Sequence, residues 1–221
     1  MIMSIIYPLI CIMLPCAVYQ IIIIKSQNLK EKQYLIPHLI WVYIFLIYIY
    51  LAFSVAGIGS IWEIGQYGEI IRIEEINLIP FRSGGIMTYI LNIIMFMPLG
   101  FLLPLIWEKF RNPLRVFLVG LGFSLAIEIC QLFNHRTTDI DDLMMNSLGA
   151  ILGYFIWVGV INLFNSISKK AFAVSKNEVI DNSIINIKPI SISKNEAIVY
   201  LTLAVLGEFL FYNWRIFFIL N

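Results

Sequence analysis

Charged residues are scarce in this chain. They make up 13% of its 221 residues, whereas soluble globular domains carry about 25%. Hydrophobic residues make up 60%, and the mean hydropathy is +0.87. These values exclude an ordinary soluble domain and predict helices embedded in a membrane. The net charge is only +1 and no basic arm or stripe is present, so we expect no nucleic acid partner.

Familiar catalytic and metal-binding motifs are also missing. The sequence contains no C-x-x-C pair, no H-E-x-x-H, no G-x-x-x-x-G-K-[ST] loop and no G-x-S-x-G. The three cysteines, Cys11, Cys16 and Cys130, lie in apolar runs, where a thiol packs as a small hydrophobic group. We therefore expect no metal centre and no cofactor, and any catalysis would rest on carboxylates.

Long apolar runs predict an all-α, polytopic transmembrane helical bundle of about six spans. We expect these spans at residues 4–24, 35–59, 86–107, 116–133, 142–164 and 197–220. The first run has neither a charged segment before it nor a small-residue cleavage site after it, so we expect it to be retained. Residues 60–85 mix charges with isoleucines and contain Pro80, which predicts a re-entrant or interfacial segment.

The chain divides into three parts. Residues 1–75 form a two-span region with the start of a long connection, residues 76–164 a three-span core, and residues 165–221 a polar connection with the last span. Ser193 and Glu196 have the spacing of a capping box at the start of that span. Glu208 and Arg215 lie seven residues apart and are interpreted as snorkelling charges, and His38 as an interfacial residue.

Lysine and arginine are distributed unequally among the connections. Residues 25–34, 108–115 and 165–195 hold eleven of the fifteen. The positive-inside rule therefore predicts a multi-pass protein of the cell membrane with both termini, and the loop at residues 134–141, on the extracytoplasmic side.

Three of the four aspartates, together with a glutamate, a histidine and an arginine, lie between residues 128 and 153. At helical spacing, one stripe consists of Gly120, Ser124, Glu128 and Gln131, and a second consists of Asp139, Asp142, Asn146, Gly149 and Gly153. The two helices are expected to pack along their small residues and to present an acidic, amide-rich pocket near the loop that joins them.

Two interpretations of this pocket stay open. Arg136 can pair with Glu128, Asp139 or Asp142, so the residues can form a latch that fixes the helix hairpin. Alternatively, the carboxylates outnumber nearby cations and leave negative charge for a cationic ligand or a divalent cation. If the protein is an enzyme acting on a lipid or lipid-linked substrate, Glu128 and Asp142 are the catalytic candidates. A proton-coupled transporter using Glu128 is a further alternative.

Several runs resemble the VanZ-like membrane protein family. They are I-N-L-I-P-F from Ile76, N-I-I-M-F-M-P-L-G-F from Asn92, E-I-C-Q-L-F from Glu128 and R-T-T-D-I-D-D-L-M-M-N-S-L-G-A-I-L-G-Y from Arg136. The resemblance covers residues 76–157. The positions it carries over are Asn77, Pro80, Phe81, Asn92, Pro98, Gly100, Glu128, Gln131, Arg136, Asp139, Asp142, Asn146 and Gly149.

The resemblance implies an integral membrane protein of the cell envelope. The founding member of the family is associated with low-level resistance to the glycopeptide teicoplanin. Expected partners are therefore membrane lipid and a glycopeptide or a lipid-linked cell-wall precursor. The family pattern implies no reaction chemistry, and it does not include Asp141.

Overall fold

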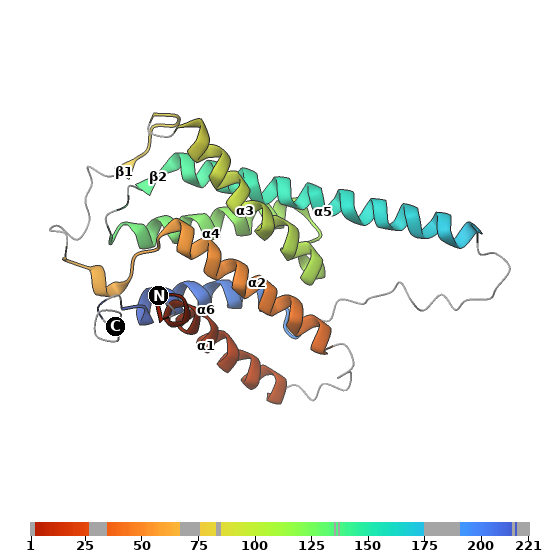
Figure 1. Ribbon diagram of the computed structural model, residues 1–221, viewed down its shortest axis with the longest axis horizontal. Coiled ribbons are helices and arrows are strands. Elements are labelled where there is room, and N and C mark those ends of the chain that lie inside the picture. The colour runs from red at the N-terminus through yellow and green to blue at the C-terminus, as the bar shows by residue number, and fades with distance from the viewer. Residues whose placement is uncertain are drawn as a thin grey trace.

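The computed structural model describes residues 3–26, 35–66, 76–82, 85–134, 136, 138–174, 191–213 and 215. Its elements in chain order are α1 (Met3–Ser26), α2 (Leu35–Ala56), the 3-10 helix η2 (Ile61–Glu63), β1 (Ile76–Asn77), α3 (Ile86–Ile106), the 3-10 helix η4 (Glu108–Phe110), α4 (Pro113–Gln131), β2 (Thr138–Asp139), α5 (Ile140–Val174) and α6 (Glu196–Phe211). The predicted all-α bundle is confirmed (Figure 1).

Five helices of the described chain, α1 to α5, are long and apolar enough to cross a membrane. These correspond to the first five predicted spans. The sixth predicted span begins as α6, whose 16 residues rise about 24 Å at 1.5 Å per residue. A full crossing takes about 20 residues. Residues 216–221, which were predicted to complete this span, lie outside the described residues.

Helix α5 continues well beyond the predicted span. It has 35 residues, so residues 165–174, predicted as the start of a polar connection, are helical. This segment contains neither glycine nor proline. Polarity marks where a helix can leave the membrane, whereas helix termination needs a breaker or a cap, and none is present here.

The core lies where α2 crosses the other helices. Phe45, Leu46 and Ile49 of α2 are fully buried, and Phe45 packs edge-on against Trp107 with ring centroids 5.2 Å apart. Large apolar side chains also cover the outside of the bundle, for example Leu163, which is 63% exposed. An apolar exterior is the arrangement expected of helices surrounded by lipid.

Helices α3 and α5 approach very closely because glycines line their contact. A Cβ atom at Gly149 would collide with the carbonyl group of Ile93, and one at Gly153 with that of Met97. The prediction that these glycines face the fourth span is therefore wrong. Gly120 does face α5, since its Cβ would lie 2.7 Å from the Ala150 Cβ.

The two ends of the bundle carry different connections (Figure 1). One end holds η2, β1, β2 and the end of α4, and the starts of α3 and α5 lie there as well. The opposite end holds η4 and the starts of α2, α4 and α6. The predicted re-entrant segment at residues 60–85 is described only in part: it contains η2, β1 and turns, while residues 67–75 and 83–84 lie outside the described residues.

Candidate functional site

A short parallel pairing joins two connections at the first of these ends. Ile76 of β1 pairs with Thr138 of β2, and Asn77 pairs with Asp139. The Asn77 Nδ2 also donates to Asp139 Oδ1 at 3.3 Å. This pairing places the segment before α3 against the segment before α5, so residues 62 positions apart in sequence form one surface.

Asp139 and Glu128 together fix the start of α5. Asp139 directly precedes the helix, and its Oδ1 accepts from the Asp141 N–H at 3.0 Å, as an aspartate at a helix N-terminus commonly does. Its own N–H donates to Glu128 Oε2 at 3.1 Å. Glu128 is 4% exposed, so this buried carboxylate of α4 holds the backbone in front of α5.

Asp141 organises the turn before α3. It is completely buried; its Oδ1 accepts from the Phe81 N–H at 2.7 Å and its Oδ2 from the Tyr89 hydroxyl at 2.9 Å. Phe81 has φ +62°, a left-handed conformation that costs a bulky residue roughly 1–3 kcal/mol. Asp141 is not among the site residues predicted from sequence, because nothing local indicates partners 52 and 60 positions away.

Asp142 lies one residue further along α5 and faces α3. Its Oδ1 accepts from the Asn92 Nδ2 at 2.5 Å. The side chain is only partly buried, unlike Asp141. The close approach of α3 and α5 through Gly149 brings these two helices near enough for the contact. Asn92 and Asp142, both predicted from sequence, are therefore neighbours in space.

Two buried amides lie deeper along α4 and α5. Asn146 donates to the Ser124 hydroxyl at 2.9 Å, and Gln131 donates to the Ala56 carbonyl at 2.7 Å. Both side chains are at most 3% exposed, and neither Asn146 Oδ1 nor Gln131 Oε1 has a hydrogen-bond partner. The Ser124 hydroxyl can donate as well as accept, so the Asn146 amide oxygen and nitrogen could exchange places. In either orientation, one of these two amide atoms has no hydrogen-bond partner among the described residues.

Arg136 takes a different position from the one predicted. Its Nη2 lies 3.4 Å from the Val55 carbonyl, its backbone N–H donates to Asn134 Oδ1, and its guanidinium covers Gly57. The described residues show no ion pair within 4.0 Å from Arg136 to a carboxylate of this region. The side chain is exposed, so solvation and a backbone carbonyl stabilise its charge in place of the predicted latch.

We call this group the acidic cluster. It consists of the carboxylates of Glu128, Asp139, Asp141 and Asp142 and the amides of Asn77, Asn92, Gln131 and Asn146. Its carboxylates accept from backbone N–H groups, amides and a tyrosine hydroxyl, all uncharged donors. The buried amide oxygens of Gln131 and Asn146 have no hydrogen-bond partner among the described residues, so the cluster is rich in hydrogen-bond acceptors.

Two further observations concern metal-binding groups and cavities. The described residues contain no group of three histidine, cysteine, aspartate or glutamate side chains that could hold a metal ion. A cavity of about 370 Å³ is present in the bundle, but it lies between α4 and α6 and is lined by apolar residues.

A comparison with known protein families finds a match for this chain. The model of the family described as VanZ/LLP1 matches residues 40–165, more than half of the chain. The chain belongs to the VanZ/LLP1 family. Neither the curated proteins nor the solved structures contain a match. The family match includes every residue of the acidic cluster and confirms the family predicted from sequence.

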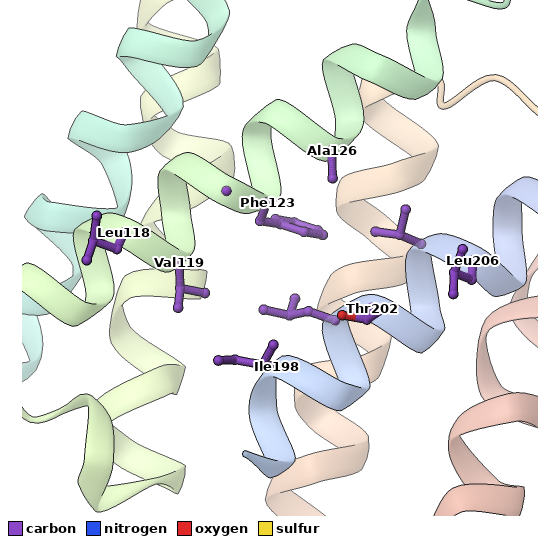
Figure 2. A pocket seen from close by; sticks show the side chains of 10 residues that line it. Leu118, Val119, Phe123, Ala126, Ile198, Thr202 and Leu206 are labelled. Atoms are coloured by element: carbon purple, nitrogen blue, oxygen red, sulfur yellow. The ribbon is translucent and has the colours of Figure 1, made fainter.

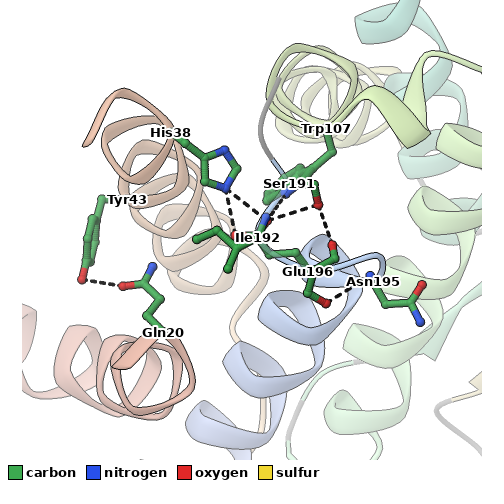
Figure 3. Close-up of polar contacts among 9 residues, drawn as sticks. Gln20, His38, Tyr43, Trp107, Ser191, Ile192, Asn195 and Glu196 are labelled. Carbon is green, nitrogen blue, oxygen red and sulfur yellow. Dashed lines mark hydrogen bonds and ion pairs between the residues drawn. The ribbon is translucent and has the colours of Figure 1, made fainter. Parts of the chain in front are cut away.

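A second polar group lies at the opposite end of the bundle and draws mostly on residues outside the VanZ/LLP1 match. Glu196, 1% exposed, accepts from His38 at 2.9 Å, from the Trp107 indole N–H at 3.0 Å and from the Ile192 N–H at 3.0 Å (Figure 3). The Ser191 hydroxyl lies 3.4 Å from the same carboxylate. We call this the Glu196 cluster; it fastens the start of α6 to α2 and to the end of α3.

The Glu196 cluster corrects one prediction. Ser193 is not the N-cap of α6: Asn195 occupies that position without a side-chain cap bond, and Glu196 is the first helical residue. The Glu196 carboxylate, which local spacing assigned to the helix end, instead accepts from donors far away in the sequence. One of them is His38, predicted as an interfacial residue, which is 7% exposed and pairs with Glu196.

Glu208 of α6 also differs from its prediction. It was interpreted as a snorkelling charge, yet it is 7% exposed and its Oε2 has no hydrogen-bond partner. It lies where α6 packs tightly on α1, next to Gly207, whose Cβ would collide with the Cys11 carbonyl. This close helix contact leaves the side chain no route to solvent.

Proposed function

We propose that this VanZ/LLP1 family member acts at the cell envelope and lowers susceptibility to glycopeptide antibiotics such as teicoplanin. Its acidic cluster, facing the extracytoplasmic side, binds a cationic or donor-rich group of the drug or of a lipid-linked cell-wall precursor. The observation that carries this proposal is the pair of buried amide oxygens, of Gln131 and Asn146, that have no hydrogen-bond partner among the described residues.

The position of the cluster supports the orientation. Helix ends that border the lysine-bearing connections lie at the end of the bundle opposite the acidic cluster (Figure 1). By the positive-inside rule that lysine-bearing end is cytoplasmic. The cluster then faces the compartment in which glycopeptides meet their targets.

Drug susceptibility tests the function. A susceptible host without a VanZ-like protein would express wild type, Glu128→Gln or Asp142→Asn, with the membrane level of each measured by immunoblot. We expect wild type to raise the teicoplanin concentration that inhibits growth several-fold, and both variants to lose most of that increase at equal protein level. Glu208→Gln, which neutralises a buried carboxylate outside the cluster, is the matched control and should behave as wild type. No protection by wild type would refute the proposal.

Thiol labelling tests the orientation separately. Leu78 is 68% exposed beside β1, and the three native cysteines are buried and can be replaced by alanine. A cysteine introduced by Leu78→Cys should react with a membrane-impermeant maleimide in intact cells. Labelling that requires permeabilised cells would place the acidic cluster on the cytoplasmic side.

A further inference from the structure

An apolar groove runs between α4 and α6. Its volume is about 370 Å³, and side chains of both helices face one another across it (Figure 2). Phe123 of α4 and Leu201 of α6 are buried at 4% and 6% exposure, while Leu118, Ile198 and Leu206 are between 42% and 55% exposed. Buried residues thus form the floor of the groove, and exposed residues form its rim.

The groove lies at the depth of the membrane interior. Its α4 residues fall between positions 118 and 126, in the middle of a helix that extends from 113 to 131 and is apolar enough to cross the membrane. The Thr202 hydroxyl is the one polar side-chain group among the lining residues. At this depth the surroundings are hydrocarbon, so the groove is filled by hydrocarbon or by another protein helix.

The dimensions of the groove favour a single hydrocarbon chain. Both walls span eight residue steps, about 12 Å at 1.5 Å per residue, and the volume divided by this length gives a cross-section of about 30 Å². A helix with its side chains is about 10–12 Å across, so a second helix could lie on the rim but its backbone could not enter the groove. Gly122 lines the groove, and a Cβ atom there would meet nothing within 4 Å, so no described side chain fills the space in front of it.

We propose that this groove is a binding site for one acyl chain of a membrane phospholipid. The chain fills the space between α4 and α6 and supplies the dispersion contacts that the two helices do not make with each other. Bound lipid therefore stabilises the position of α6 against the core. This site is on the face of α4 opposite the acidic cluster, and it does not depend on the function proposed above.

Photo-crosslinking tests the site directly. Purified protein in nanodiscs would contain a phosphatidylglycerol with 16-carbon chains, one of them bearing a mid-chain diazirine, and labelled peptides would be mapped by mass spectrometry. We expect labelling concentrated on residues 118–126 and 198–206. Gly122→Leu, which places a side chain in the groove, should reduce that labelling at least five-fold. Gly159→Leu is the matched control, because Gly159 is an equally open glycine on α5, away from the groove.

Thermal stability gives a second, independent readout. Wild type stripped of lipid in detergent should gain a few degrees in Tm when the same unlabelled lipid is added, because a ligand of the folded state stabilises it. The Gly122→Leu variant should gain much less, and Gly159→Leu as much as wild type. Ala126→Leu is a second variant that fills the groove and replaces Gly122→Leu in this test if Gly122→Leu folds poorly. It should likewise gain much less Tm than wild type.

Three results would overturn the proposal. Groove labelling that Gly122→Leu and Ala126→Leu leave unchanged would show that lipid contacts this face without occupying the groove. Labelling no stronger than on the exposed face of α5 would show ordinary bilayer contact only. A dimer in light scattering that both variants dissociate would show that a second copy of the chain fills the groove.

Discussion

Both polar clusters contain carboxylates inside an apolar bundle, but the two clusters differ in the donors that stabilise them. The Glu196 carboxylate has an ionisable partner, His38, and two further N–H donors, so one acceptor group is matched by several donors. In the acidic cluster, the described contacts of the carboxylates come from uncharged donors, and the Gln131 and Asn146 oxygens have no partner among the described residues. We interpret the Glu196 cluster as a structural fastening, because its carboxylate is matched by several donors. The unpaired amide oxygens of the acidic cluster support the ligand site proposed above.

The positions of the clusters in the family match agree with this difference. Every residue of the acidic cluster lies within residues 40–165, while Glu196 and His38 lie outside them. The Glu196 cluster is thus a way of attaching this chain's last helix, and the acidic cluster belongs to the part shared with the VanZ/LLP1 family. Variants in each cluster, and in the packing that frames them, can separate the two roles.

The largest effect is expected from the packing that frames the acidic cluster. Gly149→Leu would force α3 and α5 apart, because even a Cβ atom collides with the backbone of Ile93. Since this contact holds Asn92 beside Asp142, we expect loss of most folded protein in detergent, measured by monodisperse yield. Gly159→Leu, at an open position of the same helix, should retain wild-type yield. A normal yield for Gly149→Leu would contradict the close approach.

Breaking the Glu196 cluster should cost slightly less. Glu196→Ala leaves the buried His38 ring and Trp107 indole without their acceptor, and removal of one partner from a buried pair typically costs about 3–5 kcal/mol. We expect a clear fall in Tm with teicoplanin protection unchanged at equal protein level. The neighbouring exposed contact from Lys109 to Asn195 supplies the control, since Asn195→Ala should cost under about 1 kcal/mol. A Tm equal to wild type for Glu196→Ala would show that the cluster does not fasten α6.

Helix positions were predictable because apolar runs of the required length have few alternative structures. The stripe containing Asn146 and Gly149 was also recognised, but periodicity shows which residues share a face and not which helix they meet. Helix α5 lies between α3 and α4, so Asn146 reaches Ser124 of α4 while Gly149 packs on Ile93 of α3. Periodicity therefore predicted the shared face of these residues but not the helices that they contact.

Charge pairing was the least predictable feature. Arg136 was assigned to carboxylates because it is close to them in sequence, yet its guanidinium is exposed and contacts the end of α2. Glu196 was assigned to a local cap, yet it binds donors 158 and 89 positions away. A long side chain samples many partners, and its final contact depends on a tertiary arrangement that local spacing does not contain.

Asp141 of the acidic cluster and the exposed Arg136 should respond differently to substitution. Asp141→Asn removes the charge that accepts from the Phe81 N–H and the Tyr89 hydroxyl, and we expect a loss of about 1–3 kcal/mol, measured by thermal unfolding. Arg136→Gln removes an exposed charge without a carboxylate partner and should change stability by less than about 1 kcal/mol. If Arg136→Gln proved as destabilising as Asp141→Asn, the latch rejected above would have to be reinstated.

Glu208 provides the smallest and most discriminating effect, because it is a buried carboxylate that belongs to neither cluster. Its Oε2 has no hydrogen-bond partner, and Tyr7 and Cys11 are its polar neighbours. Burying a carboxylate oxygen without a partner is unfavourable, so the neutral, equally sized Glu208→Gln should leave Tm unchanged or raise it, by up to about 1 kcal/mol of stability. The same substitution at Glu196 should lower Tm, because the donors there require a carboxylate. A fall in Tm for Glu208→Gln would show that this side chain accepts a stabilising contact. The number of donors around a buried carboxylate would then no longer distinguish a structural carboxylate, such as that of Glu196, from one without a structural role.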